Sequence, residues 1–276
     1  MLRSVCLLIA LLLSPSASAD KDLQFGVVNL RSVLLTVQLW NPILAYVTEK
    51  TGVPLVLKMG KTADETTVRT VQGDFDFVFT NHLFTPERNK LGYRVIARFD
   101  NEGIRGLVVV LASSPYTKLS DLQGKVVAFP TPNGFGGYAL PMDGLQKAGV
   151  VVDTVFMGNQ EAALSNLQYG KTAAAGVNNI TLANYSRRES LAYRVLYQSA
   201  VYFDVPIMAH PRVPAVTVNK VRQALVGMAQ DARGQQILLA ASVLLNMDQS
   251  LRFVSANNED YENYREFYRH QKTSEH

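Results

Sequence analysis

The chain has 276 residues and a formal net charge of +4, with 47% hydrophobic and 18% charged residues. This hydrophobic content is enough for one large core or two modest ones, and the low charged fraction argues against disorder. The small positive excess is spread without a run of like charges. It therefore excludes the basic patch of a nucleic-acid-binding protein and suits a small anionic partner.

The first residues have the pattern of a secretory signal peptide. Arg3 precedes an apolar run at 5–13, and Ala17-Ser18-Ala19 has the small-x-small spacing that signal peptidase cleaves. The run is shorter than the roughly 20 residues needed to cross a bilayer. We therefore expect a signal peptide at 1–19, cleavage after Ala19 and a mature protein in the periplasm. Because the one cysteine, Cys6, lies within this signal, we expect no disulfide and no thiolate chemistry in the mature chain.

Short β-branched runs alternate with amphipathic stretches in the first part of the mature chain. Strands are predicted at 23–28, 55–59, 75–80 and 93–99. Between the first two, Trp40, Leu44 and Val47 recur at helical spacing, and this helix is expected to end at Gly52. A second helix is predicted at 62–72. Strands that alternate with helices indicate βαβ units and a largely parallel sheet.

A second series of strands and helices follows Gly103. Strands are predicted at 104–112, 126–130, near 155, at 173–177 and at 193–197, with helices at 138–147 and 161–169. A strand at 207–210 comes next, and then helices at 218–230, 235–245 and 260–269, which we expect to pack on the first series. The sequence thus predicts two α/β lobes, one formed by 20–103 with 205–276 and the other by 104–204.

Candidate ligand-binding residues lie next to the predicted strands. In open α/β sheets, ligands bind beyond the carboxyl ends of strands, where helix N-termini offer free N–H groups and a positive dipole. The residues at or near such positions are Asn29, Arg31 and Ser32, then Thr80, Asn81 and His82, then Thr131, Asn133, Gly136, Gly137 and Tyr138, and finally Asn178 and Asp204. Asparagine and serine are also frequent helix caps, and a lone arginine is often only solvated, so both interpretations stay open.

The stretch at 131–138 is the most informative of these. Its glycines let the backbone approach a ligand closely, and Thr131, Asn133 and Tyr138 supply neutral donors and an aromatic ring. The pattern predicts an oxyanion cradle, and a flexible glycine-rich turn is the alternative. It is neither a Walker loop nor a dinucleotide-binding loop, because no lysine and hydroxyl pair follows the glycines and their spacing differs.

The sequence lacks the residues that a metal site or a catalytic site would need. His82, His210 and His270 lie in unrelated segments, so neither a metal cluster nor a cofactor is expected. Asp74 and Asp76 alternate with phenylalanines and belong to one face of a predicted strand. A serine hydrolase would need a GxSxG elbow, which the sequence does not contain. We therefore expect a binding protein and not an enzyme.

Several segments together resemble the periplasmic phosphate, phosphite and phosphonate-binding proteins of ABC transporters, the PhnD-like family with a type II binding fold. The segments are Phe25-Gly26-Val27-Val28, Trp40-Asn41-Pro42, Thr51-Gly52-Val53-Pro54, Gly73-Asp74-Phe75-Asp76, the stretch at 119–129 and Asp204-Val205-Pro206-Ile207. The resemblance implies an α/β protein of two lobes, with a ligand cleft between two mixed or parallel sheets. It also implies a protein that captures a small oxyanion and delivers it to an inner-membrane permease. Because the alternating segments split into two α/β series with a double crossover, we expect a monomer that binds one ligand between its lobes.

The resemblance extends to the site. In that family, neutral hydroxyl and amide donors at helix N-termini hold the oxyanion, a role that carries over onto Thr131, Asn133 and the residues at 136–138. Asn178 and Asn179 are neutral where acidic residues would accompany an amine-bearing phosphonate, so a classical aminoalkylphosphonate is not expected. A related branch of the same fold serves a membrane sensor kinase, and this alternative stays open because the chain does not encode its partner.

Overall fold

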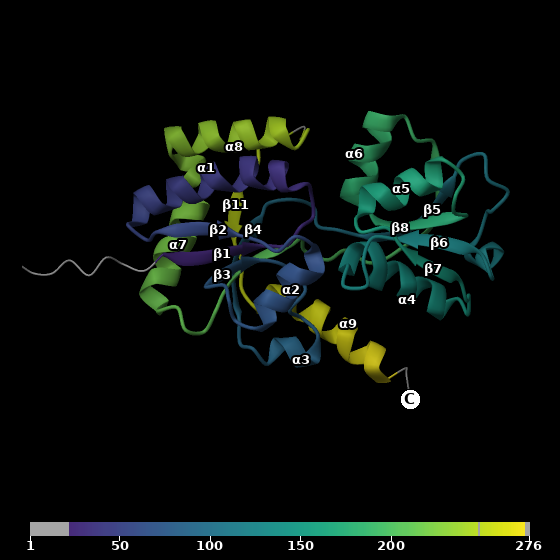
Figure 1. Ribbon diagram of the computed structural model, residues 1–276, viewed down its shortest axis with the longest axis horizontal. Helices are drawn as coiled ribbons and strands as arrows, with labels where there is room; N and C mark the ends of the chain where they lie inside the picture. The colour runs from purple at the N-terminus through teal and green to yellow at the C-terminus, as the bar shows by residue number, and fades with distance from the viewer. Residues whose placement is uncertain (1–21, 248, 274–276) are drawn as a thin grey trace, which may run out of the picture.

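The computed structural model describes residues 22–247 and 249–273, so the predicted signal peptide lies outside the described residues. The chain forms two mixed β-sheets, each with helices on both faces (Figure 1). This arrangement confirms the predicted α/β class. The first sheet with its helices is here named the first lobe, and the second sheet with its helices the second lobe.

The first lobe contains a six-stranded sheet in the order β11-β4-β10-β3-β1-β2. Its strands are β1 (Leu23–Val27), β2 (Leu55–Lys58), β3 (Phe77–Phe79), β4 (Arg94–Phe99), β10 (Pro206–Ala209) and β11 (Phe253–Ser255). β1 pairs in parallel with β2 and β3, whereas β10 runs antiparallel to β3 and β4. The prediction of a largely parallel sheet is wrong for this half, because β10 returns from the second lobe and enters the sheet from the opposite end.

Six α-helices of the described residues belong to this lobe. They are α1 (Val33–Thr51), α2 (Ala63–Val71), α3 (Pro86–Asn89), α7 (Ala215–Gly227), α8 (Ala232–Leu244) and α9 (Glu262–Thr273). α1 begins where the Ser32 hydroxyl accepts a hydrogen bond from the Leu35 N–H, and it ends at Gly52, whose φ of 70° is left-handed. Trp40 on α1 is 1% exposed and lies in the core between α1, α7, α8 and the sheet. Of the helices in the described residues, none is both long and apolar enough to span a membrane.

The second lobe contains a five-stranded sheet in the order β7-β6-β8-β5-β9. Its elements are β5 (Gly106–Leu111), β6 (Val126–Phe129), α4 (Leu140–Lys147), β7 (Asp153–Phe156), α5 (Gln160–Gln168), β8 (Ala174–Asn178), α6 (Asn179–Glu189) and β9 (Tyr193–Gln198). β6 is parallel to β7 and β8, whereas β5 is antiparallel to β8 and β9. α6 is an element that the sequence did not predict.

The chain passes between the lobes twice, at 100–105 and at 199–205. The two passages lie side by side, because Ile104 and Tyr202 form an antiparallel bridge. The lobe boundaries predicted after 103 and after 204 fall within these passages. Two adjacent connections of this kind are the usual geometry of a hinge.

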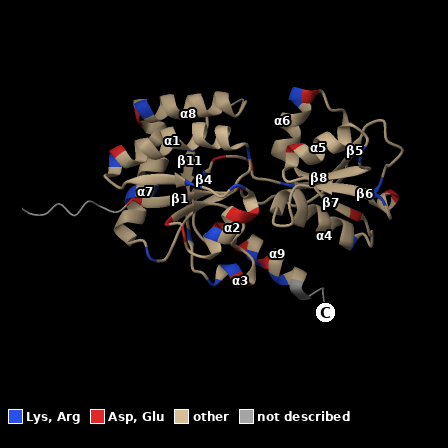
Figure 2. Ribbon diagram, viewed as in Figure 1, with Lys and Arg blue, Asp and Glu red and all other residues tan. Residues whose placement is uncertain are grey.

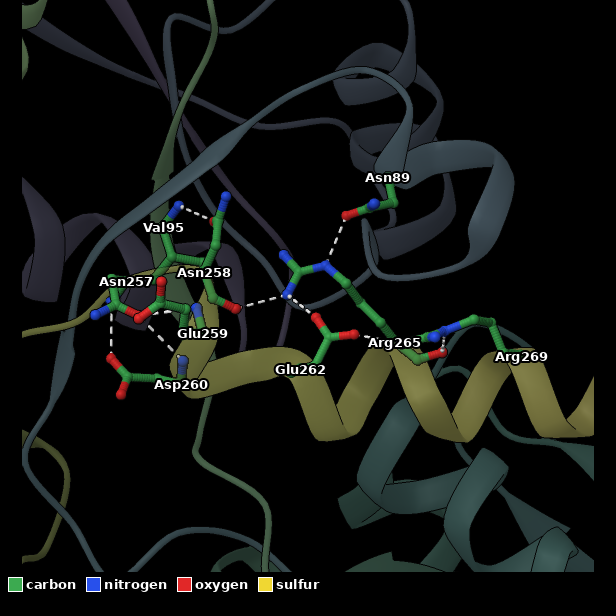
Figure 3. Close-up of polar contacts among 9 residues, drawn as sticks. All are labelled: Asn89, Val95, Asn257, Asn258, Glu259, Asp260, Glu262, Arg265 and Arg269. Atoms are coloured by element: carbon green, nitrogen blue, oxygen red, sulfur yellow. Dashed lines mark hydrogen bonds and ion pairs between the residues drawn. The ribbon is translucent and has the colours of Figure 1, made fainter.

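The C-terminal helix α9 starts beneath the first sheet and runs toward the second lobe (Figure 1). Arg265 anchors it to the first lobe. Its Nε donates to Asn89 Oδ1 at 2.8 Å, and its Nη1 donates to the Asn258 carbonyl oxygen at 2.6 Å (Figure 3). Asn258 in turn accepts a hydrogen bond from the Val95 N–H of β4 at 2.9 Å. The start of α9 is therefore fixed to β4 and α3 by hydrogen bonds.

Candidate functional site

A cavity of about 590 Å³ lies between the lobes, next to the hinge. Its walls come from the end of β1, the start of α1, both hinge passages, the segment after α8 and the helix α6. The apolar part of the lining includes Leu30, Trp40, Phe79, Phe99, Leu245 and Met247, and the polar part includes Arg31, Asn101, Asn179, Asn184, Asp204 and Arg252. A cavity of this size with a few convergent polar groups is typical of a small-molecule site. We name it the hinge cavity.

Arg31 brings a positive charge into the hinge cavity. Within residues 22–247 and 249–273, no group accepts a hydrogen bond from its guanidinium, although Asp204 and Glu161 act on its charge. Burial lowers the pKa of Arg31 from its ordinary value, and the two carboxylates oppose this effect. A guanidinium carries five donors in a planar fork, so an arginine without an acceptor in a cavity is a ready contact for an oxyanion.

Asp204 lies at the hinge side of the same cavity and is engaged within the protein. One carboxylate oxygen accepts from Asn101 Nδ2 at 3.0 Å and the other from the Val205 N–H at 2.7 Å. Burial raises the pKa of Asp204, while these hydrogen bonds and the charge of Arg31 oppose the rise. Asp204 therefore fixes the hinge and supplies a negative charge near Arg31.

The predicted cradle occupies the inner edge of the second lobe. Gly136 and Gly137 belong to a short π-helical turn at Phe135–Ala139 that leads into α4. A Cβ atom at Gly136 would lie 3.1 Å from Asn178 Cβ, and one at Gly137 would lie 3.3 Å from Gln160 Cδ. The structure thus brings Gly136, Gly137 and Asn178 together. Asn178 also begins α6, because its Oδ1 accepts from the Thr181 N–H at 2.7 Å.

Phe135, in the middle of the cradle, points into an aromatic cluster. The ring is 1% exposed and contacts Tyr202, Tyr264 and Phe267. On the first-lobe side, Asn81 forms a side-chain hydrogen bond with the Tyr264 hydroxyl, and that hydroxyl donates to the Phe203 carbonyl at 2.5 Å. Asn81 and the cradle are therefore connected through α9.

Asn133 and Thr131 lie in the loop before this turn. The Nδ2 of Asn133 donates to Asp64 Oδ1 at 2.6 Å, and its Oδ1 accepts from Arg88 at 3.0 Å. Both partners belong to the first lobe, so Asn133 bridges the lobes. Thr131 is half-buried, and its carbonyl accepts from the Gly134 N–H at 3.1 Å.

The remaining predicted residues have partners within one lobe. Asn29 donates to the Gly60 carbonyl and accepts from Thr66, and Ser32 caps α1. Thr80 accepts from the His82 N–H, and His82 Nδ1 lies 2.7 Å from Thr67 Oγ1. The ring of Tyr138 packs edge-on against Phe129 and Phe156 in the second lobe. Of the predicted set, only Arg31 and Asp204 line the hinge cavity.

The sequence analysis did not predict the polar residues that α6 and the segment between α8 and β11 contribute to the hinge cavity. Asn179, Asn184 and Arg187 come from α6, and Arg252 follows α8. The sequence does contain one signal for α6, since Asn178 is a favoured N-cap residue at the end of a strand. Arg252 is held by Asp100, whose Oδ2 accepts from its Nε at 2.6 Å.

Charged residues of both signs are spread over both lobes (Figure 2). Across the described part of the chain, no group of three or more His, Cys, Asp or Glu side chains is placed to hold a metal ion. Among the described residues, the lining of the hinge cavity combines three guanidinium groups, three carboxylates, several amides and apolar side chains, and its guanidinium groups can bind and orient an anion.

Solved structures share this fold. PhnD1 from Prochlorococcus marinus MIT 9301, in complex with methylphosphonate, is 17% identical with a TM-score of 0.76, covering 92% of this chain and 99% of that chain. A binding protein component of an ABC phosphonate transporter from Pseudomonas aeruginosa is 14% identical with a TM-score of 0.73, covering 90% and 85%. A Xanthomonas citri protein bound to ATP is 16% identical with a TM-score of 0.74, covering 92% and 98%. These similarities define a two-lobed binding fold.

The family comparison is more specific. A family model described as the periplasmic substrate-binding protein of phosphonate ABC transporters matches residues 25–261. The chain therefore belongs to the family of periplasmic phosphonate-binding components of ABC transporters, as the resemblance implied. This family consists of substrate-binding proteins that work with a transporter. The comparison with curated proteins gives no match.

Proposed function

We propose that this chain captures a phosphonate or a related small oxyanion in the hinge cavity and delivers it, as a monomer, to an inner-membrane ABC permease. The signal peptide at 1–19 would be removed after Ala19 on export to the periplasm. The family description names a transporter and not a sensor kinase. Binding and release, without a covalent step, are the whole of the proposed activity.

The observation that carries this proposal is the position of Arg31. Its guanidinium lines the hinge cavity, and no described residue accepts a hydrogen bond from it. Arg31 is exposed, so its five donors are open to an oxyanion that enters the cavity, where charge-assisted hydrogen bonds would form. Gly136, Gly137, Asn178 and Thr131 lie outside the lining of the hinge cavity, so they carry no part of this proposal.

Isothermal titration calorimetry with phosphate, phosphite, methylphosphonate, sulfate and arsenate tests the proposal. We expect one oxyanion per chain, and the ligand should be recovered chemically unchanged. Arg31→Gln should weaken binding by about tenfold to a hundredfold, because a hydrogen bond to a charged group contributes roughly 1.5 to 3 kcal/mol.

Arg233→Gln is the matched control. Arg233 pairs with Glu49 on the surface of the first lobe and lies outside the hinge cavity lining, so its loss should leave affinity unchanged. The proposal fails if none of the five oxyanions binds, or if Arg31→Gln binds the ligand as tightly as the unmodified chain does.

A further inference from the structure

We infer that Tyr261 and Tyr264 are positioning residues for ligand binding. Their hydroxyl groups hold the main chain of the second hinge passage, at 199–205, and through it keep Asp204 at the hinge cavity. The inference rests on the proposed function, because it concerns the affinity for the ligand of that cavity. It adds to that function two residues that do not line the cavity and that act through the hinge.

The two hydroxyl groups bind adjacent carbonyl groups of the second passage. Tyr261 Oη donates to the Asp204 carbonyl oxygen at 2.6 Å, and Tyr264 Oη donates to the Phe203 carbonyl oxygen at 2.5 Å. Both tyrosines are 0% exposed. Burial raises the pKa of each hydroxyl above its ordinary value, so both hydroxyls stay protonated and can donate.

The rings that carry these hydroxyls are packed into the first lobe. Tyr261 stacks on Phe84, with the centroids 5.2 Å apart and the planes at 10°, and Tyr264 contacts the same ring at 4.9 Å. The three rings belong to a buried cluster that includes Val78 of β3 and Met208 of β10. Because closely packed side chains move little, the two hydroxyls are fixed points to which the passage is tied.

Side-chain contacts hold the same two residues of the passage. The Arg98 guanidinium lies over the Phe203 ring, with its central carbon 4.1 Å from the ring centroid. The Asp204 carboxylate accepts a hydrogen bond from Asn101 Nδ2 at 3.0 Å, and Asn101 belongs to the other hinge passage. The hydroxyl bonds therefore fix the main chain at the point where the side chains join the two passages to each other and to β4.

These bonds limit where the hinge can bend. A hinge works through changes of φ and ψ at a few residues, and such a change at Phe203 or Asp204 would turn their carbonyl groups away from the tyrosine hydroxyls. A buried carbonyl group that loses its donor is costly, so bending is confined to the rest of the passage. Asp204, whose charge acts on Arg31, thereby keeps its place in the cavity lining.

Tyr261→Phe, Tyr264→Phe and the double variant test the inference, because each substitution removes one oxygen atom and keeps the ring. Hydrogen–deuterium exchange of the ligand-free chain, followed by mass spectrometry, reports on the passage. Amide exchange in peptides that cover 199–205 should become about fivefold faster in each single variant, and faster still in the double variant. A fivefold change corresponds to about 1 kcal/mol at 1.4 kcal/mol per tenfold, the usual contribution of one hydrogen bond.

Calorimetry on the same variants measures the consequence for binding. The probes are phosphate, phosphite, methylphosphonate, sulfate and arsenate. The double variant should bind the preferred oxyanion at least about fivefold more weakly than the unmodified chain does, because a smaller fraction of the molecules holds Asp204 and Arg31 in the binding arrangement.

Tyr93→Phe is the matched control. The Tyr93 hydroxyl is also buried and also donates to a main-chain carbonyl oxygen, that of Phe75 at 3.0 Å, but this bond lies within the first lobe and away from both passages. Tyr93 also lies outside the lining of the hinge cavity. Its loss should lower the urea midpoint as the hinge variants do, yet leave exchange at 199–205 and the affinity unchanged.

The possible failures are distinguishable. If the unmodified chain binds an oxyanion but the double variant binds it equally tightly, or exchanges at 199–205 no faster, the inference is overturned while the proposed function stands. The same holds if Tyr93→Phe matches the double variant in both measurements. If none of the five oxyanions binds to the unmodified chain, the proposed function and the inference fail together.

Discussion

The ring of Phe135 stacks on the ring of Tyr264, with the centroids 4.0 Å apart and the planes at 28°. Phe135 belongs to the turn before α4 in the second lobe, whereas Tyr264 belongs to α9, which is anchored to the first lobe through Arg265. Their contact therefore joins the lobes at a point away from the hinge passages. This contact also fixes the positions of the residues on either side of Phe135 in the turn before α4.

Phe135→Ala should destabilise the protein by about 3 to 5 kcal/mol, the usual range for removing a fully buried phenylalanine. Urea denaturation followed by circular dichroism measures the change. Tyr169→Ala is the control, because Tyr169 is 75% exposed and its removal should change stability by less than about 0.5 kcal/mol. A loss for Phe135→Ala no larger than that of the control would show that the aromatic cluster does not hold the lobes.

Asn133→Ala should shift the ligand-free protein toward a more open form. Its amide bridges Asp64 and Arg88 of the first lobe at 2.6 and 3.0 Å, and both bonds involve charged partners near solvent. Their loss is worth about 1 kcal/mol, so the ratio of open to closed molecules should rise roughly fivefold.

Small-angle X-ray scattering would detect this shift as a larger mean radius of gyration. Asn166→Ala serves as the control, since the Asn166 amide donates to the Ala162 carbonyl within the second lobe. Equal radii for Asn133→Ala and the unmodified chain would contradict a bridging role.

Much of the fold could be predicted from local patterns. The stop at Gly52 and the helical spacing around Trp40 lie within one element, so the sequence alone reveals them. α6 was missed because only Leu182 and Tyr185 in it are buried, which leaves too weak a hydrophobic pattern. β11 has three residues and depends on pairing with β4, so no local signal marks it.

The site was harder to predict because its parts come from distant segments. The rule that ligands bind after strands identified Arg31, which lies in the segment between β1 and α1. It could not show that Phe135 turns into a cluster formed by Tyr264, since that depends on α9 crossing between the lobes. Nor could it place Leu245 and Arg252 at the same cavity as Arg31.

Gly106→Ala should disturb the inner edge of the second lobe. A Cβ atom there would lie 2.3 Å from Leu140 Cβ and 3.1 Å from the Gly136 carbonyl oxygen, so the turn that carries the cradle would have to move. We expect a loss of about 1 to 3 kcal/mol in stability, together with weaker ligand binding.

Gly227→Ala is the matched control for this experiment. Gly227 is the last residue of α7, and no atom lies within 4 Å of a Cβ added there. Alanine should therefore leave the free energy of unfolding unchanged or raise it by up to about 1 kcal/mol. Thermal unfolding and calorimetry on both variants compare the two sites. Unchanged stability and affinity in Gly106→Ala would mean that the turn does not need this close approach.

His82 should make stability depend on pH on the acid side of neutrality. Its side chain is 6% exposed, and burial, aided by the charge of Arg88, lowers the pKa of His82 from 6.5 to about 4. The folded protein thus keeps His82 neutral, whereas the unfolded chain takes up a proton near its ordinary pKa. This contribution to stability is complete above pH 6.5 and is lost as the pH falls toward about 4, by about 3 kcal/mol in total. Urea midpoints measured between about pH 7 and about pH 4 should therefore fall less steeply in His82→Gln than in the unmodified chain. Parallel curves for His82→Gln and the unmodified chain would contradict the assignment of a neutral, buried His82.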